Sequence, residues 1–476
     1  MGAGVSHWKL AQAVSRRGQL GVVSGTALDQ ILARRLQDGD PGGHMRRALD
    51  AFPVQAIARR ILDKYYIPGG KPKSEPYLPL TMLTQKNTPE LDELCIAANF
   101  VEVWLARQGH NNPVGINFLE KIQFAHLSAI YGSMLGGVDY IIMGAGIPLR
   151  IPGVIDAYVN HQPAEYPLAV RGVQPGDDFT MHFNPRQYLD ADLPPLKRPR
   201  FLSIISSNTL AITMLKKANG RVDGFVVETP VAGGHNAPPR GAMQLSPSGE
   251  PIYGERDVVD LPRLRELNVP FWLAGGYGTP DMIRHALEQG AAGVQVGTAF
   301  AFSLESGLDP DIRRRLLASA VDGSARVFTD PLASPTGYPF KVALLENSAS
   351  EASVFAARPR ICDLGYLREP YRTPEGEVGY RCASEPVSIY ESKGGALPET
   401  VGRKCVCNAL LANIGMPQTR KGNRTEAALV TTGDDLVSIP QFLPPGQLEY
   451  TVSDVLKVLL PPGIEALRQP TVAFSV

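Results

Sequence analysis

A histidine preceded by two glycines, His235, lies in the segment from Glu228 to Gly241, which reads ETPVAGGHNAPPRG. The apolar segment just before it, RVDGFVV, is typical of a strand that is buried on both faces. An imidazole can take up or release a proton near neutral pH. His235 therefore follows a predicted strand at a point where acid or base chemistry could take place.

Glycines also follow two later predicted strands, in AGGYGT and QVGTAF. Glycine lets backbone amides approach a phosphate closely, and the N-terminus of the next helix adds its positive dipole. In a parallel barrel the loops after the last two strands often form such a site. The alternative is that these glycines only make tight turns. Neither segment, nor GAGIPL, has the full G-x-G-x-x-G spacing, so a mononucleotide fits better than a dinucleotide.

Seven apolar segments are predicted to be strands, and nearly all of them are followed by a helical pattern. They are Leu20 to Gly25, Pro113 to Phe118, Asp139 to Gly146, Arg200 to Ser207, Asp223 to Glu228, Phe271 to Gly276 and Gly293 to Thr298. This alternation predicts an α/β fold with a parallel sheet, a (β/α)8 TIM barrel whose first strand is absent or truncated. We expect the first strand to precede Met1. The alternative, Tyr166 to Val173, is expected to pair as a hairpin with Asp177 to Phe183.

Long insertions interrupt the repeating unit. We expect a barrel domain over residues 1–323, with a helical insertion at 26–109 and a hairpin insertion at 172–199. Residues 324–476 are rich in Pro, Gly and Cys and show little periodicity. They are predicted to form an extension packed on the barrel, referred to below as the C-terminal extension.

The composition favours a small-molecule partner. With 47 basic and 47 acidic residues, nothing indicates binding to nucleic acid or to an anionic membrane. The N-terminus lacks the pattern of a signal peptide, and no stretch contains eighteen uninterrupted apolar residues. Five cysteines in a chain of this length fit a reducing compartment, so a cytoplasmic location is expected.

Four of the cysteines lie in the extension: Cys362, Cys382, Cys405 and Cys407. Four thiolates could close a tetrahedral zinc site. No C-x-x-C pair occurs and the separations are long. We therefore expect buried reduced thiols and no metal.

Four motifs in order resemble the nitronate monooxygenase (2-nitropropane dioxygenase) family, which shares its scaffold with the FMN-dependent bacterial enoyl-acyl-carrier-protein reductases. They are MGAGVSHWKLAQAVSRRGQLGVVSG, VAGGH, LAGGYGT and GAAGVQVGTAFAFSLES. The resemblance covers roughly Met1 to Phe302 and implies a barrel that binds FMN non-covalently. The C-terminal extension has no counterpart in the compact monooxygenases of this family.

The resemblance also implies site residues. It places the FMN phosphate on Gly275, Gly276, Gly297 and Thr298, and Met1, Gly2 and Asn117 near the flavin ring. Glu228 stands where the family more often has glutamine, and a carboxylate there disfavours the anionic reduced ring. His235 would be the base that takes the proton next to a nitro group, with Gly233 and Gly234 letting the backbone turn under the flavin. The other histidines are expected to be structural: His7, His44, His110, His126, His161, His182 and His285.

Three functions remain open at this stage. The resemblance implies, first, oxidation of an alkyl nitronate with O2 to a carbonyl compound and nitrite, without a nicotinamide. The second is NAD(P)H-dependent reduction of an enoyl thioester, with an acyl carrier protein as a possible partner. The third is a non-catalytic scaffold subunit. The extension could form a lid for a bulkier substrate.

Overall fold

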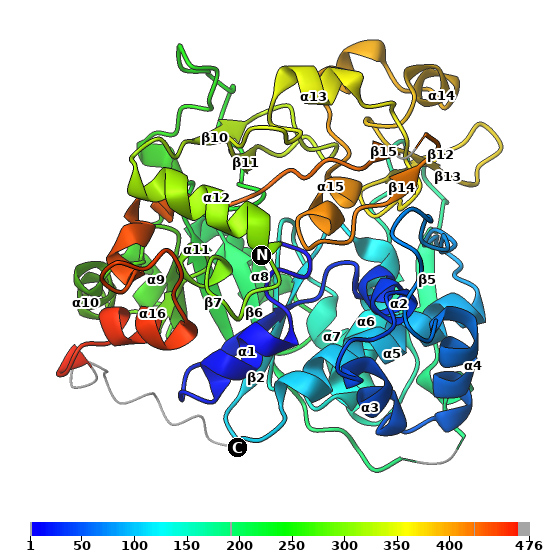
Figure 1. Ribbon diagram of the computed structural model, residues 1–476. Helices are drawn as coiled ribbons and strands as arrows, with labels where there is room; N and C mark the ends of the chain where they lie inside the picture. Colours follow the sequence, from blue (N-terminus) through cyan, green and yellow to red (C-terminus); the bar gives the residue numbers. More distant parts are fainter. Residues whose placement is uncertain (1, 191–192, 423, 465–476) are drawn as a thin grey trace.

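A curled parallel sheet of seven strands forms the centre of the molecule, in the order β1-β2-β3-β6-β7-β8-β9 (Figure 1). The computed structural model describes residues 2–190, 193–422 and 424–464. The strands are β1 (Gly21–Ser24), β2 (Val114–Leu119), β3 (Tyr140–Gly144), β6 (Arg200–Ile205), β7 (Gly224–Glu228), β8 (Phe271–Ala274) and β9 (Gly293–Gln295). All six neighbouring pairs are parallel. The predicted α/β barrel-type fold and all seven predicted strands are therefore confirmed.

The sheet remains open between β1 and β9 over the described residues. Both edge strands nevertheless line one apolar cavity, together with Ile142, Leu202 and Val226 from the strands between them. The two edges therefore curl toward each other, as in a barrel that lacks one strand.

The strands alternate between two apolar environments, because successive side chains point to opposite faces of a sheet. Ile142, Leu202, Val226 and Ala274 form a small cluster inside the curled sheet. Their neighbours along the strands, such as Phe201 and Phe225, belong to the main core on the other face. Burial on both faces explains the continuous apolar runs of the sequence.

Helices follow most strands and pack around the sheet. They are α1 (Trp8–Ser15), α2 (Leu28–Gln37), α3 (His44–Asp50), α4 (Gln55–Tyr65), α5 (Pro89–Ala106), α6 (His126–Leu135), α7 (Ile151–Val159), α8 (Asn208–Lys217), α9 (Leu261–Arg265), α10 (Pro280–Glu288), α11 (Thr298–Ala301), α12 (Pro310–Val321), α13 (Ala352–Ala357), α14 (Val387–Ser392), α15 (Val406–Ala412) and α16 (Val452–Leu459). Short 3-10 helices are η1 (Gln123–Ala125), η2 (Pro185–Tyr188), η3 (Glu255–Asp257), η4 (Leu397–Thr400) and η5 (Asp434–Phe442).

Side-chain caps mark the start of two helices that follow strands. The hydroxyl of Thr279 accepts a hydrogen bond from Met282 N at the start of α10. Ser207 plays the same part for α8 by accepting from Leu210 N. Such caps satisfy backbone donors that the helix itself leaves free, and they fix where each helix begins relative to its strand.

The two inserted segments form compact local structures. Helices α2 to α5 fill the long connection from β1 to β2, and α5 packs along α6, α1 and α2. Strands β4 (Ala164–Pro167) and β5 (Thr180–Phe183) pair antiparallel, as expected for the hairpin. The hairpin therefore begins before residue 172, the expected start of that insertion.

The C-terminal extension carries the antiparallel pairs β10 (Val327–Asp330) with β11 (Phe340–Ala343), β12 (Glu369–Arg372) with β13 (Val378–Arg381), and β14 (Thr419–Arg420) with β15 (Arg424–Thr425). These strands lie together with α13 and α14 at the top of Figure 1. Phe340, Tyr366, Val406 and Leu429 of the extension belong to the same apolar core as the strands of the sheet.

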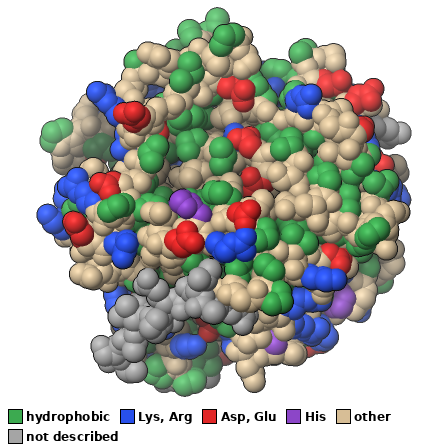
Figure 2. Space-filling view, turned by 90° about the vertical axis from the view of Figure 1, so that its left-hand side faces the viewer, with side chains coloured by type: hydrophobic (Ala, Val, Ile, Leu, Met, Phe, Trp, Pro, Cys, Tyr) green, Lys and Arg blue, Asp and Glu red, His purple; other side chains and the backbone are tan. Residues whose placement is uncertain are grey.

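Charges of both signs are interspersed on the face shown in Figure 2, which agrees with the equal numbers of basic and acidic residues. Among the described residues, no helix is both long and apolar enough to cross a membrane.

Candidate active site

Three neighbouring cavities lie at the carboxyl ends of the strands. The central one, called here the ring cavity, is lined by Gly2, Asn117 and Gly234, among others. Glu228 lines all three cavities, and His235 lines the ring cavity and the one called here the substrate cavity. The third, called here the cradle, shares Gly2, Gly233 and Gly234 with the ring cavity. The shared residues show that the cavities form one continuous site.

The cradle brings together the glycine-rich ends of three strands: Gly233 and Gly234 after β7, Gly275 after β8, and Gly297 with Thr298 after β9. A Cβ atom added to Gly297 or Gly234 would meet no atom within 4 Å and would project into open space. Gly275 has φ = 85°, a left-handed conformation that favours glycine. The backbone is therefore open to a ligand at Gly297, one of the positions predicted for a phosphate.

His235 lies between the ring cavity and the substrate cavity. Its Nε2 is 2.6 Å from the hydroxyl oxygen of Ser334, and its ring centroid is 4.8 Å from that of Phe340. Burial lowers the pKa of His235 to about 3. The imidazole is therefore neutral at physiological pH and carries a free lone pair, although the same burial makes it a weaker base than an exposed histidine.

Glu228 ends β7 and carries the site's central carboxyl group. Burial raises its pKa, because a charged carboxylate loses its hydration in such a place. A protonated carboxyl is a neutral hydrogen-bond donor and acceptor, as an amide is. A protonated Glu228 therefore offers a ligand the same kinds of neutral hydrogen bond that a glutamine side chain would.

The segment Thr431 to Asp435 of the extension crosses the cradle. Thr431 accepts a hydrogen bond from Gly234 N at 2.9 Å, and the N–H of Gly433 donates to the Thr298 hydroxyl at 3.1 Å. A Cβ on Gly233 would lie only 2.7 Å from Gly433 N. Gly233 is therefore needed for this close backbone approach. This segment was not predicted from the sequence, where its composition, TTGDD, is the only signal.

Asp435 places a carboxyl group beside the cradle. It accepts a hydrogen bond from the backbone N–H of Gly276, and burial followed by the neighbouring Asp434 raises its pKa. Asp434 itself pairs with the buried Lys341 at 2.8 Å. Gly276 is thus engaged by the extension and does not line the cradle.

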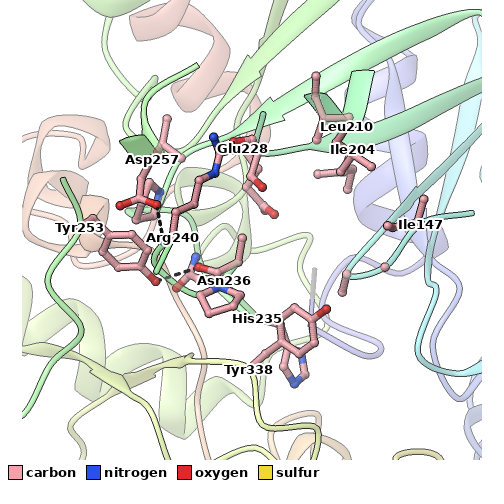
Figure 3. A pocket seen from close by; sticks show the side chains of 18 residues that line it. Ile147, Ile204, Leu210, Glu228, His235, Asn236, Arg240, Tyr253, Asp257 and Tyr338 are labelled. Atoms are coloured by element: carbon pink, nitrogen blue, oxygen red, sulfur yellow. Dashed lines mark hydrogen bonds between the residues drawn. The ribbon is translucent and has the colours of Figure 1, made fainter. Parts of the chain in front are cut away.

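The substrate cavity has a volume of about 260 Å³ and an uneven lining (Figure 3). Ile147, Ile204 and Leu210 form an apolar wall. The opposite side carries Arg240, whose guanidinium donates to Ser206 O at 2.7 Å and whose backbone N–H donates to Asp257. The cavity therefore suits a small molecule with an apolar chain and a polar head.

Most of the predicted site residues line these cavities. The residues that line the ring cavity or the cradle are Gly2, Asn117, Glu228, Gly233, Gly234, His235, Gly275, Gly297 and Thr298. Gly276 is adjacent but turned toward Asp435, and Met1 lies outside the described residues. His235 and the Gly297 turn lie at the same end of the sheet.

The cysteines of the extension are free thiols. Cys362 and Cys382 hydrogen-bond to each other, and Cys407 lines the ring cavity. Among the described residues, no group of three or more His, Cys, Asp or Glu side chains is arranged to hold a metal ion.

The fold and site define a barrel-type α/β protein with a glycine-rich cradle at the strand ends. Residues 196–332, which include β6 to β10, match the family model described as nitronate monooxygenase. Over this segment the chain is therefore identified as nitronate monooxygenase-like. The match confirms the predicted resemblance and the assignment to that family's enzyme class, the oxidoreductases. No curated protein matches significantly.

Several solved structures resemble this chain. FabK from Thermotoga maritima is 16% identical with a TM-score of 0.45, and the alignment covers 98% of this chain and 92% of that one. Nitroalkane oxidase from Streptomyces ansochromogenes is 14% identical with a TM-score of 0.45, covering 98% and 94%. The enoyl reductase domain of MlnA from the macrolactin biosynthesis cluster of Bacillus amyloliquefaciens is 12% identical with a TM-score of 0.45, covering 98% and 93%.

Proposed function

We propose that this chain is an FMN-dependent oxidoreductase that oxidises alkyl nitronates with O2 to a carbonyl compound and nitrite. The supporting observation is that His235, a neutral imidazole, lies between the ring cavity and the substrate cavity. A small-molecule substrate would enter the substrate cavity, and FMN would occupy the other two.

The residues present fit FMN. Gly297, Thr298 and Gly275 would hold the phosphate through backbone N–H groups, as the open space at the Cβ position of Gly297 allows. Asn117 and Glu228 would contact the polar edge of the ring. When bound, FMN supplies the capacity to accept electrons from the substrate.

The side chains of the substrate cavity would bind and activate a nitro compound. Ile147, Ile204 and Leu210 would pack against its alkyl chain. The guanidinium of Arg240 lies on the polar side, where it could donate a hydrogen bond to a nitronate oxygen. His235 would remove the proton from the carbon next to a neutral nitro group, forming the nitronate in place.

One experiment separates the proposal from its rival. In anaerobic stopped-flow, a preformed nitronate is expected to bleach the flavin absorbance rapidly and NADPH only slowly. Rapid bleaching by NADPH with none by nitronate would contradict nitronate oxidation. A preparation that binds no flavin would point instead to a scaffold subunit.

Enoyl-thioester reduction is the second candidate, and Glu228 is the observation that favours it. Reduction of an enoyl double bond adds hydride to one carbon and a proton to the next. Since burial raises the pKa of Glu228, its carboxyl group is a proton source in the same cavity as His235. Reduction of an enoyl thioester by NADPH in the presence of the protein would support this reading.

Replacing Glu228 with glutamine should change the flavin potential only at high pH. The raised pKa keeps Glu228 neutral at low pH, so wild type and Glu228→Gln are expected to have equal potentials at pH 6. At pH 9 the wild-type carboxylate opposes the anionic reduced ring, which lowers its potential by on the order of 20–60 mV relative to the variant. Spectroelectrochemical titration of both proteins measures this, with exposed Glu255→Gln as the control. Equal potentials at pH 9 would place Glu228 away from the ring.

Replacing Asp435 with asparagine should strengthen FMN binding. A carboxylate at Gly276 repels a phosphate in the cradle, so Asp435→Asn is expected to lower the Kd for FMN about tenfold at pH 8. Because burial and Asp434 raise the pKa of Asp435, the difference should shrink as the pH falls and the wild-type group is protonated. Fluorescence titration with FMN at pH 8 and pH 5.5 measures both effects, with exposed Asp322→Asn as the control. Weaker FMN binding by the variant would contradict a phosphate next to this carboxyl group.

A further inference from the structure

A chain of hydroxyl groups from the C-terminal extension ends on His235. The Ser334 hydroxyl, which belongs to a fully buried side chain, lies 2.6 Å from His235 Nε2 and 2.8 Å from the Thr336 hydroxyl. Thr336 N donates to the Ser334 oxygen at 3.3 Å, and Tyr338 N donates to the Thr336 oxygen at 3.3 Å. Ser334 lies just beyond the segment that matches the nitronate monooxygenase model.

The donors and acceptors of this chain can be assigned in two arrangements that use every group, one for each neutral tautomer of His235. If His235 Nε2–H donates to Ser334, the Ser334 oxygen accepts two hydrogen bonds and its own O–H donates to Thr336. Nε2 then carries the proton, and the lone pair lies on Nδ1. Because Nε2 is taken up by Ser334, Nδ1 is the ring nitrogen left for a substrate. In the opposite arrangement Thr336 donates to Ser334 and Ser334 donates to Nε2, so Nδ1 carries a proton and cannot accept one. Only the first arrangement lets His235 act as a base.

The same segment also holds the backbone around His235. Asn236 N donates to Pro339 O and Lys341 N donates to Gly234 O, both at 2.9 Å. Arg403 in turn donates to the Ser334 backbone carbonyl at 2.7 Å. The imidazole and its loop are therefore held by hydrogen bonds to one segment of the extension, Ser334 to Lys341.

We infer that Ser334, with Thr336 behind it, is a positioning residue that holds His235 as the Nε2–H tautomer and directs its Nδ1 lone pair into the substrate cavity. This inference rests on the proposed function, because a base needs the Nδ1 lone pair, but the tautomer can be measured independently of activity. When Nδ1 takes up the substrate proton, the hydrogen bond from Nε2–H to Ser334 becomes charge-assisted. It then stabilises the imidazolium and holds the ring in place. The C-terminal extension thus supplies the residues that position the base.

The test combines a spectroscopic signature with two substrates. Two-bond ¹H–¹⁵N spectra of the ¹⁵N-histidine-labelled, flavin-loaded protein report which ring nitrogen is protonated, and the signals of His235 are those lost in His235→Gln. We expect the Nε2–H tautomer in wild type and a mixture or the other tautomer in Ser334→Ala. We also expect Ser334→Ala to lower kcat/KM for neutral nitroethane by on the order of 10- to 100-fold and to leave that for ethyl nitronate nearly unchanged.

A matched control removes another buried hydroxyl of the extension. Ser348 is fully buried and donates to Leu345 O at 2.7 Å, away from His235. Ser348→Ala should leave both the tautomer and the ratio of the two substrates unchanged. Thr336→Val, which removes the acceptor behind Ser334, should shift the tautomer in the direction of Ser334→Ala.

The outcomes separate this inference from the proposed function. An Nδ1–H tautomer in wild type, or identical His235 signals in wild type and Ser334→Ala, would overturn the positioning role. Equal loss on nitroethane and ethyl nitronate would also overturn it, because a merely structural defect affects both. A wild-type Nε2–H tautomer lost in Ser334→Ala, in a protein that oxidises neither substrate, would uphold the positioning role and reject nitronate oxidation.

Discussion

Replacing His235 with alanine is expected to lower kcat/KM for neutral nitroalkanes by about 10²–10⁴-fold, the usual contribution of a general base. The same variant should keep its flavin and oxidise preformed nitronates at close to the wild-type rate. The reason is that a preformed nitronate has already lost the proton that His235 would remove. Burial keeps this imidazole neutral, so we expect no loss of the base form between pH 8 and pH 6.

Steady-state oxygen consumption with nitroethane and with ethyl nitronate measures this ratio. His182→Ala is a suitable control, because His182 is an exposed residue on the hairpin, paired with Glu165. If the two substrates lose activity equally in His235→Ala, His235 does not act as the base. Loss of flavin from the variant would instead give the residue a binding role.

Replacing Gly297 with alanine should strongly weaken FMN binding without unfolding the protein. The residue has φ = −110°, which alanine adopts readily, and its new methyl group would meet no protein atom within 4 Å. The methyl group would occupy the space predicted for the phosphate. Loss of one or two charge-assisted hydrogen bonds, at about 1.5–3 kcal/mol each, raises the Kd for FMN by roughly 10- to 10⁴-fold.

Flavin content after purification and the melting temperature of the apoprotein together measure this effect. Gly254→Ala is the matched control. Gly254 has φ = −128°, which alanine also adopts, and open space at its Cβ position, but it does not line the cradle. Normal flavin content in Gly297→Ala would contradict the cradle as the phosphate site. A large fall in the apoprotein melting temperature would contradict the open space seen at this position.

The strand ends could be predicted from sequence because each carries a local signal. Burial on both faces made the run before Glu228 apolar, and glycines at the strand ends marked where a backbone had to remain accessible. His235, Gly275 and Gly297 followed from those two signals and from chain order in a parallel barrel.

Ser334 and the Thr431 to Asp435 segment could not be predicted in the same way. They lie about 100 and 200 residues after His235, in a part of the chain with little periodicity, and only tertiary packing brings them to the site. The role of Gly233 was also hidden, because it depends on the close approach of Gly433 from the extension. The engagement of Gly276 by Asp435 has the same origin.

We propose that a flavin lies across the strand ends with its phosphate in the glycine cradle and the His235 imidazole over its ring. A crystal structure of the protein loaded with FMN tests it most directly. We predict phosphate oxygens within hydrogen-bonding distance of the Gly297 and Thr298 backbone N–H groups, with the ring between Asn117 and His235. A phosphate bound away from this cradle, or a ring on the far side of the sheet from His235, would contradict the account.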